Sequence, residues 1–303
     1  MLFPVEKMLF LCYNYGTFNG CEYKEENMKL GISSPLAHIS PEDWAAKQKQ
    51  EGCGCVVFPL SCEDKEADIA AYEQAARING LQVAEVGIWR NALAADEKER
   101  NAAMDYSIGQ LRLADRLHAR CCVNVAGAAG PVWDGAYKEN FSQNMWDRTV
   151  RMIQEILDEA KPEHTYFTLE SMPWMIPGSP EEYLRLLAAV NRDRFAVHLD
   201  IINMITTPER YFFPERFLEQ TFSLLGPHIR SCHVKDILLL PSYTFQLREC
   251  ACGDGTFPLE YYAELADRTD PEMPMIIEHL DTDAAYLQSL GYVRQRLAKA
   301  KTI

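Results

Sequence analysis

The feature that most constrains how this 303-residue chain can fold is a regular alternation of short apolar segments with longer amphipathic ones. Apolar residues recur at helical spacing in the amphipathic segments, which indicates helices between buried strands. Strands joined by helices run parallel, and eight such units close into a barrel. The apolar segments lie at residues 29–36, 53–60, 81–89, 120–128, 165–171, 195–204, 229–237 and 274–281. The chain is therefore predicted to be an α/β protein, a (β/α)8 barrel.

Local signals support the helices and the limits of the domain. Ser40-Pro41 and Ser179-Pro180 each precede acidic residues, which is typical of a helix N-terminus. Longer helices are expected over 96–119 and 137–160. The first apolar segment is not followed by G-x-G-x-x-G, which disfavours a doubly wound sheet. We predict one barrel domain at 28–303 and a short N-terminal extension at 1–27, which lacks the layout of a secretory signal.

Charge and cysteine usage limit the partners. The net charge of −14 repels polyphosphate, so nucleic acid is not expected to bind. The sequence has no apolar run near the roughly 20 residues of a membrane helix, so no membrane partner is expected. Ten cysteines without C-x-x-C spacing indicate reduced thiols rather than disulfides or structural zinc. We expect a cytoplasmic protein and leave open its assembly into a homo-oligomer.

Polar residues at the ends of the last four apolar segments indicate a metal site. Catalytic groups of such barrels lie at the C-terminal ends of the strands, where this chain has Glu170, Asp200, His233 and Glu278. Three converging carboxylates would repel one another unless a cation joined them. Oxygen donors with one imidazole suit Mn²⁺ foremost, or Mg²⁺, Co²⁺ or Fe²⁺, with Zn²⁺ as a further alternative.

Other polar residues lie close to these four in the sequence. His198 lies two residues before Asp200 on the same strand face, where a supporting histidine is favoured over a ligand. Lys235 shares the face of His233, and it either donates to a substrate oxygen or pairs with Asp236. His279 should face away from the site and have a packing role.

The motifs "TLESMPW", "VHLDIINMI", "SCHVKDI" and "MIIEHLD" resemble those of the xylose isomerase-like barrel superfamily, from Met28 to the C-terminus. Within it they resemble proteins described as sugar phosphate isomerase/epimerase. The resemblance implies that metal-bound Glu170 and Glu278 move a proton on either side of an enediolate, with Asp200 and His233 completing the ligand set. A bound metal polarises the carbonyl, and a carboxylate moves the proton.

The resemblance also implies sugar contacts, with two departures. Ketose 3-epimerases have a substrate-binding histidine at the position of Asn203. They also have an arginine after the metal-binding histidine, and the only candidate for it in this sequence is Arg248. The candidate substrate-binding residues are His198, Asn203, Lys235, Arg248, Trp89, Trp174, His38 and Glu85.

A second chemistry fits the same resemblance. The large subunit of bacterial C-glycoside deglycosidases has this barrel and cleaves 3-oxo-glycosides by β-elimination, with a small β-rich partner subunit. Residues 238–258 are long for a loop after a strand and contain a strand-like portion. They are expected to form a lid, a partner surface or an ordinary excursion. Gly253 to Gly255 form either a phosphate-binding turn or, as we favour, a plain turn.

Two other classes are less favoured. Apurinic endonucleases share the barrel but hold three metals with many more histidines, whereas this acidic chain has seven histidines in all. A non-catalytic sugar-binding barrel would not need the paired Glu170 and Glu278. The sequence therefore predicts a metal-dependent sugar isomerase or epimerase acting next to a carbonyl, with the lyase and the binding barrel as alternatives.

Overall fold

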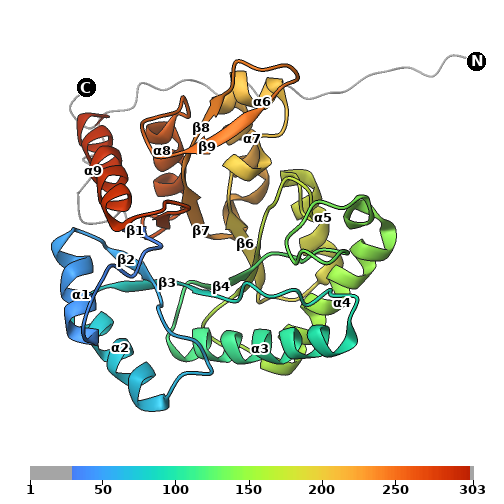
Figure 1. Cartoon of the computed structure of the whole chain (residues 1–303), viewed down its shortest axis with the longest axis horizontal. Coiled ribbons are helices and arrows are strands. Elements are labelled where there is room, and N and C mark those ends of the chain that lie inside the picture. The colour runs from blue at the N-terminus through green and yellow to red at the C-terminus, as the bar shows by residue number, and fades with distance from the viewer. Residues whose placement is uncertain (1–28, 301–303) are drawn as a thin grey trace, which may run out of the picture.

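The computed structural model describes residues 29–300, and the extension predicted at 1–27 lies outside them. Eight parallel strands form one sheet in the order β1-β10-β7-β6-β5-β4-β3-β2, ringed by helices (Figure 1). The strands are β1 (Lys29–Ile32), β2 (Cys55–Val57), β3 (Gln82–Gly87), β4 (Cys121–Asn124), β5 (Phe167–Glu170), β6 (Phe195–Leu199), β7 (Ile229–Val234) and β10 (Pro274–Ile277). All eight lie within the predicted apolar segments, so the barrel prediction is confirmed.

The first two strands lie against each other and close the ring. The amide of Gly54 donates to the carbonyl of Leu30 at 2.8 Å. A Cβ at Gly31 would lie 2.4 Å from the carbonyl oxygen of Cys55. Only glycine therefore fits at this seam.

The helices begin where the sequence signals place them. The side chains of Ser40 and Ser179 accept hydrogen bonds from the amides of Asp43 and Glu182. The helix predicted over 137–160 is interrupted, because Ser142 ends η1 (Lys138–Phe141) and caps α4. The α-helices are α1 (Pro41–Gln50), α2 (Glu66–Ile78), α3 (Glu97–Arg116), α4 (Gln143–Ala160), α5 (Pro180–Val190), α6 (Pro208–Phe212), α7 (Pro214–Leu225), α8 (Leu259–Thr269) and α9 (Asp283–Ala300); η2 (Ile202–Met204) and η3 (Gly226–His228) are 3-10 turns.

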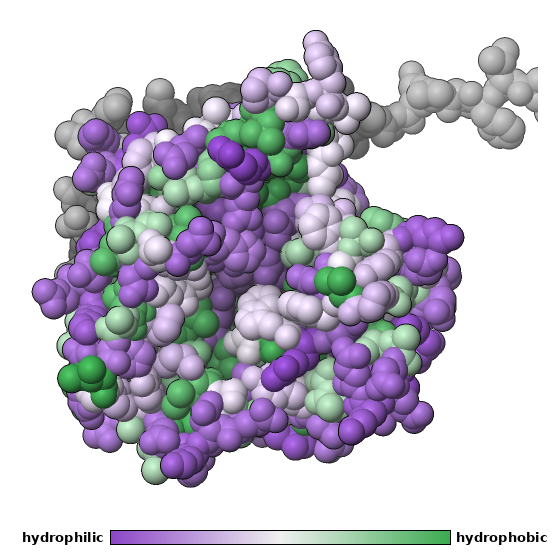
Figure 2. All heavy atoms as spheres, viewed as in Figure 1, coloured by the Kyte–Doolittle hydropathy of each residue, from purple (hydrophilic) through white to green (hydrophobic). Residues whose placement is uncertain are grey.

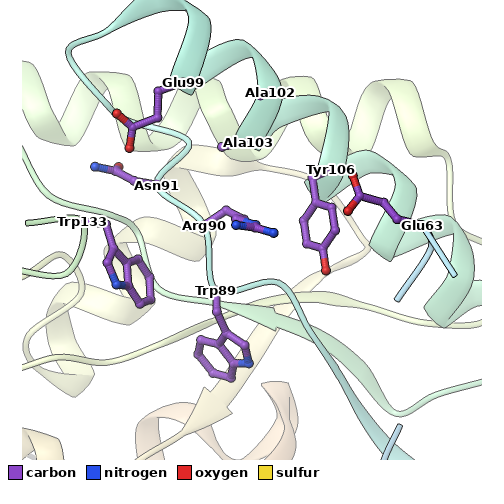
Figure 3. A pocket seen from close by; sticks show the side chains of 9 residues that line it. All are labelled: Glu63, Trp89, Arg90, Asn91, Glu99, Ala102, Ala103, Tyr106 and Trp133. Atoms are coloured by element: carbon purple, nitrogen blue, oxygen red, sulfur yellow. The ribbon is translucent and has the colours of Figure 1, made fainter. Parts of the chain in front are cut away.

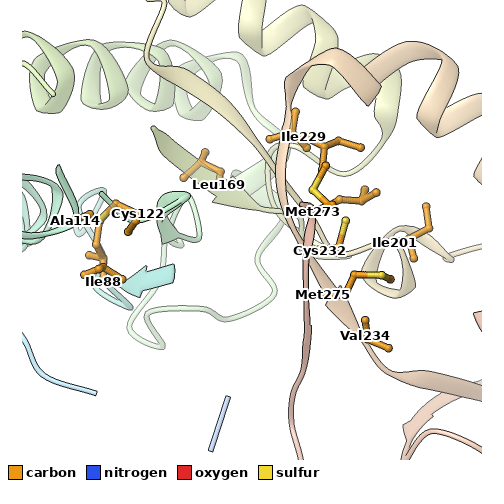
Figure 4. Packing of buried hydrophobic residues seen from close by; sticks show 14 of the residues in the cluster. Ile88, Ala114, Cys122, Leu169, Ile201, Ile229, Cys232, Val234, Met273 and Met275 are labelled. Carbon is orange, nitrogen blue, oxygen red and sulfur yellow. The ribbon is translucent and has the colours of Figure 1, made fainter. Parts of the chain in front are cut away.

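The main hydrophobic core includes strand residues and residues of the surrounding helices (Figure 4). Leu169, Cys232 and Val234 belong to it and are buried. Side chains alternate along a strand, so Glu170 and His233 point the other way, into the barrel. The interior at this end of the barrel is therefore polar instead of filled by Val, Ile and Leu.

An antiparallel hairpin follows β7, formed by β8 (Asp236–Leu239) and β9 (Leu247–Cys250). It is part of the segment for which a strand-like portion was predicted. The hydroxyl of Tyr211 in α6 accepts a hydrogen bond from the amide of Leu239 at 3.0 Å, which ties the hairpin to α6. Between residues 29 and 300, no helix combines the length and apolarity needed to cross a membrane.

Candidate metal centre

Four buried side chains converge at the C-terminal ends of β5, β6, β7 and β10. Glu170, Asp200, His233 and Glu278 each offer a ligand atom, and these atoms all lie within 4.8 Å of one another. Nδ1 of His233 is 2.8 Å from Oε2 of Glu278, 3.7 Å from Oε1 of Glu170 and 3.9 Å from Oδ2 of Asp200. The structure thus brings together the four residues predicted as metal ligands. Figure 2 shows this face of the molecule, hollowed at its middle and lined there by hydrophilic residues.

The electrostatics of the cluster favour positive charge. Burial alone would lower the pKa of His233, but Glu278, Glu85 and Glu170 raise it well above its usual value. Burial raises the pKa of Asp200 to about 8, with Lys235 opposing this and Glu278 adding to it. Glu278 shows the converse effect, because His233 and Lys235 outweigh burial and hold its pKa well below its usual value. The buried carboxylates of this cluster are therefore stabilised by positive charge placed next to them.

Lys235 supplies part of that positive charge. Its buried ammonium lies 2.6 Å from Oδ2 of Asp200, 2.7 Å from Oε1 of Glu278 and 3.1 Å from Oε2 of Glu249. The alternative that Lys235 pairs with Asp236 is therefore wrong.

The carboxylate of Asp236 binds backbone amides instead. It accepts hydrogen bonds from the amides of Gly253 at 3.0 Å, Gly255 at 3.2 Å and Phe257 at 2.9 Å. These amides already have an anionic partner within the chain. The plain-turn interpretation of Gly253 to Gly255 is thus favoured over a phosphate cradle.

Glu85, predicted to contact substrate, lies instead behind the histidine of the cluster. The residue is 1% exposed, and its Oε2 is 3.3 Å from Nε2 of His233. Ser231 donates to its other oxygen. Because a carboxylate only accepts, this contact places a proton on Nε2 and directs Nδ1 at the carboxylate cluster. Glu85 therefore orients His233, and the prediction of a substrate contact is corrected.

His198 is also too deeply buried to contact substrate. It has no exposed surface, its Nδ1 is 3.6 Å from Oε1 of Glu85, and its ring meets that of His233 edge to face. Neither ring nitrogen has a hydrogen-bond partner of good geometry within the described chain. Burial, with the charge of His233, lowers its pKa to about 4, so the ring is neutral near pH 7.

Two further candidate substrate-binding residues, His38 and Arg248, make no contact with the four-residue cluster and stay predictions. His38 lies 2.7 Å from the carbonyl of Leu36 through Nδ1 and 2.7 Å from the hydroxyl of Tyr72 through Nε2. Arg248 is exposed on β9, next to Glu249, whose side chain reaches Lys235. Successive side chains of a strand face opposite ways, so Arg248 points away from the cluster.

Of the other predicted contacts, Asn203 lies at the centre, and the two tryptophans lie in the loops after β5 and β3. Nδ2 of Asn203 donates to Oε1 of Glu170 at 3.0 Å, and its backbone amide donates to Oδ1 of Asp200 at 3.0 Å. Trp174 is half-buried, and its Nε1 donates to the carbonyl of Asp134. Trp89 is 40% exposed after β3.

Sequence reasoning missed Glu249 and Ser231 and misplaced His279. Ser231 lies two residues before His233, and that spacing was available as a signal. Glu249 carries no such signal, because only the fold of the hairpin brings it to Lys235. The imidazole of His279, expected to pack away from the site, is half-exposed and lies 3.1 Å from Oε1 of Glu249 through Nδ1.

The donor set fits a divalent cation. Three carboxylates and one imidazole are hard and borderline ligands suited to Mn²⁺, Mg²⁺ or similar ions. Nδ1 of His233 has no hydrogen bond of good geometry, although it is buried and faces carboxylate oxygens. A cation bound between Nδ1 and these carboxylates would replace the proton that the raised pKa of His233 otherwise keeps there.

The fold and the cluster together define a (β/α)8 barrel with a candidate metal centre at the C-terminal ends of its strands. The chain belongs to the xylose isomerase-like TIM barrel family, whose sequence profile matches residues 45–296. Searching curated proteins gave no match.

Solved structures show the same fold at low identity. A D-allulose 3-epimerase from Methylomonas sp. is 16% identical with a TM-score of 0.65, over 89% of this chain and 98% of its own. A 3-keto-D-glucoside 4-epimerase from E. coli is 14% identical with a TM-score of 0.62, over 88% and 99%. A xylose isomerase-like TIM barrel protein from Mycobacterium smegmatis, in complex with magnesium, is 15% identical with a TM-score of 0.65, over 91% and 97%.

Proposed function

We propose that this protein is a divalent-metal-dependent sugar isomerase or epimerase that moves a proton next to a carbonyl. The observation that carries the proposal is the convergence of Glu170 and Glu278 with Asp200 and His233 in one buried cluster. The similarity to sugar epimerases of known structure supports the same class.

The two glutamates would act as the acid and base. Glu170 takes a proton from the carbon next to the carbonyl, and Glu278 delivers one on the opposite face, or the reverse. Asn203 holds Oε1 of Glu170 and so fixes the direction of that carboxylate. Lys235 keeps Glu278 ionised, and on this proposal it would donate to a substrate oxygen.

The metal would be held by Glu170, Asp200, His233 and Glu278, and when bound it supplies a Lewis acid for the substrate's carbonyl and hydroxyl oxygens. Mn²⁺ is the ion we propose first. Glu85 and His198 keep the side of His233 remote from the substrate buried and dry.

The proposal is tested by metal analysis together with deuterium exchange. The purified protein should hold about one divalent ion per chain, and Asp200→Asn should lose most of it. A panel of ketoses incubated in D2O with Mn²⁺ should gain deuterium next to the carbonyl, because the glutamates exchange protons with solvent. Glu170→Gln should abolish the exchange, while Glu159→Gln on the surface should not. Absence of both metal and exchange would refute the proposal.

A second candidate is cleavage of 3-oxo-glycosides with a small partner subunit, and the β8–β9 hairpin favours it. The hairpin is a separate two-stranded sheet with Tyr243 fully exposed at its turn. Among the described residues, 29–300, the outer edge of β9 pairs with no further strand, so it offers an edge to which a β-rich partner can add. Release of the aglycone from a 3-oxo-C-glycoside, with and without that partner, distinguishes this activity from epimerisation.

A further inference from the structure

A pocket of about 510 Å³ opens at the C-terminal end of β3, separate from the four-residue cluster. Its volume lies within the usual range of ligand sites. Its lining is Glu63, Trp89, Arg90, Asn91, Glu99, Ala102, Ala103, Tyr106 and Trp133 (Figure 3). None of these is a member of the candidate metal centre, so a ligand group held here is not the group that reacts. We propose that this pocket binds a second sugar ring, so that the substrate is a two-ring glycoside; this rests on the proposed function.

Aromatic rings supply the surface for such a ring. Trp89 is 40% exposed and is held at φ 52°, a backbone conformation that costs about 1 kcal/mol or more in a non-glycine residue. A Cβ at Gly87 would lie 2.2 Å from Nε1 of Trp89, so glycine makes room for the indole at the end of β3. Together with half-buried Trp133, this presents indole rings against which the C–H face of a sugar packs.

Charged side chains supply partners for hydroxyl groups. Arg90 lies over the ring of Tyr106, with its guanidinium carbon 4.8 Å from the ring centroid, and has no carboxylate partner among residues 29–300. Glu63 and Glu99 are exposed and lie at different ends of the pocket (Figure 3). The two carboxylates accept hydrogen bonds from hydroxyl groups, and the guanidinium donates hydrogen bonds to them. Their net negative charge disfavours a phosphate, so the ligand class is a neutral polyhydroxylated ring.

Packing connects this pocket to the metal centre. Trp133 packs in a small hydrophobic cluster that includes Met172 and Trp174, in the loop just after Glu170. Nδ2 of Asn203 contacts both Sδ of Met172 at 3.6 Å and Oε1 of Glu170 at 3.0 Å. A residue of the pocket lining and the loop after Glu170 therefore pack against the same small core. On this proposal, a ligand with one ring at Glu170 extends its second ring toward Trp133.

The experiment measures binding of one-ring and two-ring sugars by calorimetry and saturation-transfer NMR. The probes are methyl β-D-glucopyranoside and the disaccharides cellobiose, maltose and lactose. At least one disaccharide should bind more tightly than the methyl glucoside. Trp89→Ala and Trp133→Ala should weaken the disaccharide about 5- to 10-fold, and leave the one-ring probe within about twofold. Trp146→Ala is the matched control, because that ring lies in α4 against Arg185 and does not line the pocket.

Two results would overturn the inference: no disaccharide binding more tightly than the methyl glucoside, or unchanged disaccharide affinity in both tryptophan variants. The same titrations in Asp200→Asn separate it from the proposed function. Tryptophan-dependent disaccharide binding without metal binding or exchange refutes only the reaction. Metal-dependent exchange on ketoses without such binding refutes only the second-ring pocket.

Discussion

Replacing Glu85 should weaken metal binding although Glu85 is not one of the four proposed ligands. Its carboxylate lies 3.3 Å from Nε2 of His233, and Ser231 donates to its other oxygen. Such a carboxylate fixes the ring so that Nδ1 faces the metal, and it increases the basicity of the imidazole. Both effects act on metal affinity through His233 alone.

The magnitude follows from what each variant retains. Glu85→Gln keeps an acceptor for Nε2 but loses the negative charge, so the Mn²⁺ dissociation constant should rise about 10-fold. Glu85→Ala loses the acceptor and leaves a buried space beside His233 and Ser231, so the rise should approach 100-fold. These changes correspond to about 1.4 and 2.7 kcal/mol.

The assay is a competition titration of Mn²⁺ against a fluorescent chelator, at a temperature well below unfolding of every variant. Glu159→Gln is the control for loss of a surface carboxylate, since this side chain is 66% exposed. A purely structural role for Glu85 would lower thermal stability without changing the Mn²⁺ affinity of the folded protein. Wild-type affinity within twofold in Glu85→Ala would refute the orienting role.

Three other changes test the electrostatics and the barrel seam. Lys235→Met should destabilise the metal-free protein by about 3–5 kcal/mol, because two buried carboxylates lose their partner, and Mn²⁺ should restore most of the melting temperature in scanning fluorimetry. His198→Gln should reduce the loss of stability between pH 6.5 and 4 by up to about 3 kcal/mol in urea titrations. The folded pKa of His198 is about 4, so between pH 6.5 and 4 the imidazole stays neutral in the folded protein and is protonated only in the unfolded chain. Lowering the pH over this range therefore stabilises the unfolded chain, and removing His198 removes that effect. An unchanged pH profile would contradict this burial effect. Gly31→Ala should cost about 1–3 kcal/mol or prevent folding, because its Cβ would meet the backbone at Cys55; a melting temperature equal to wild type would show that the seam relaxes freely.

The barrel and the four-residue cluster could be predicted from the sequence because both depend on periodicity. Glu170 and His233 lie at or next to the ends of β5 and β7, and a parallel sheet places all such ends at one side. Side chains alternate along a strand, so Leu169 points outward and Glu170 points into the barrel. The sequence therefore predicts the orientation of these side chains as well as their place along the strand.

The surroundings of the cluster were not predictable in the same way. Glu85 can either orient His233 or contact the substrate, depending on its height along the barrel axis relative to β7. The sequence has no pattern that gives the relative heights of residues on β3 and β7. His38 finds Tyr72 in α2, a contact between residues distant in the sequence. Glu249 reaches Lys235 only because β8 and β9 pair with one particular register.

The four candidate ligands all come from the second half of the chain, whereas the pocket beside β3 is lined entirely by residues 63 to 133. On the two proposals made above, the two halves of the barrel carry separable tasks. Substitutions after β2, β3 and β4 can reshape what the mouth accepts without displacing a single ligand atom. Substrate preference can then change through the first half while the reacting groups stay the same. Glu85 on β3 is the exception, because it contacts His233 and so links the first half to the candidate metal centre.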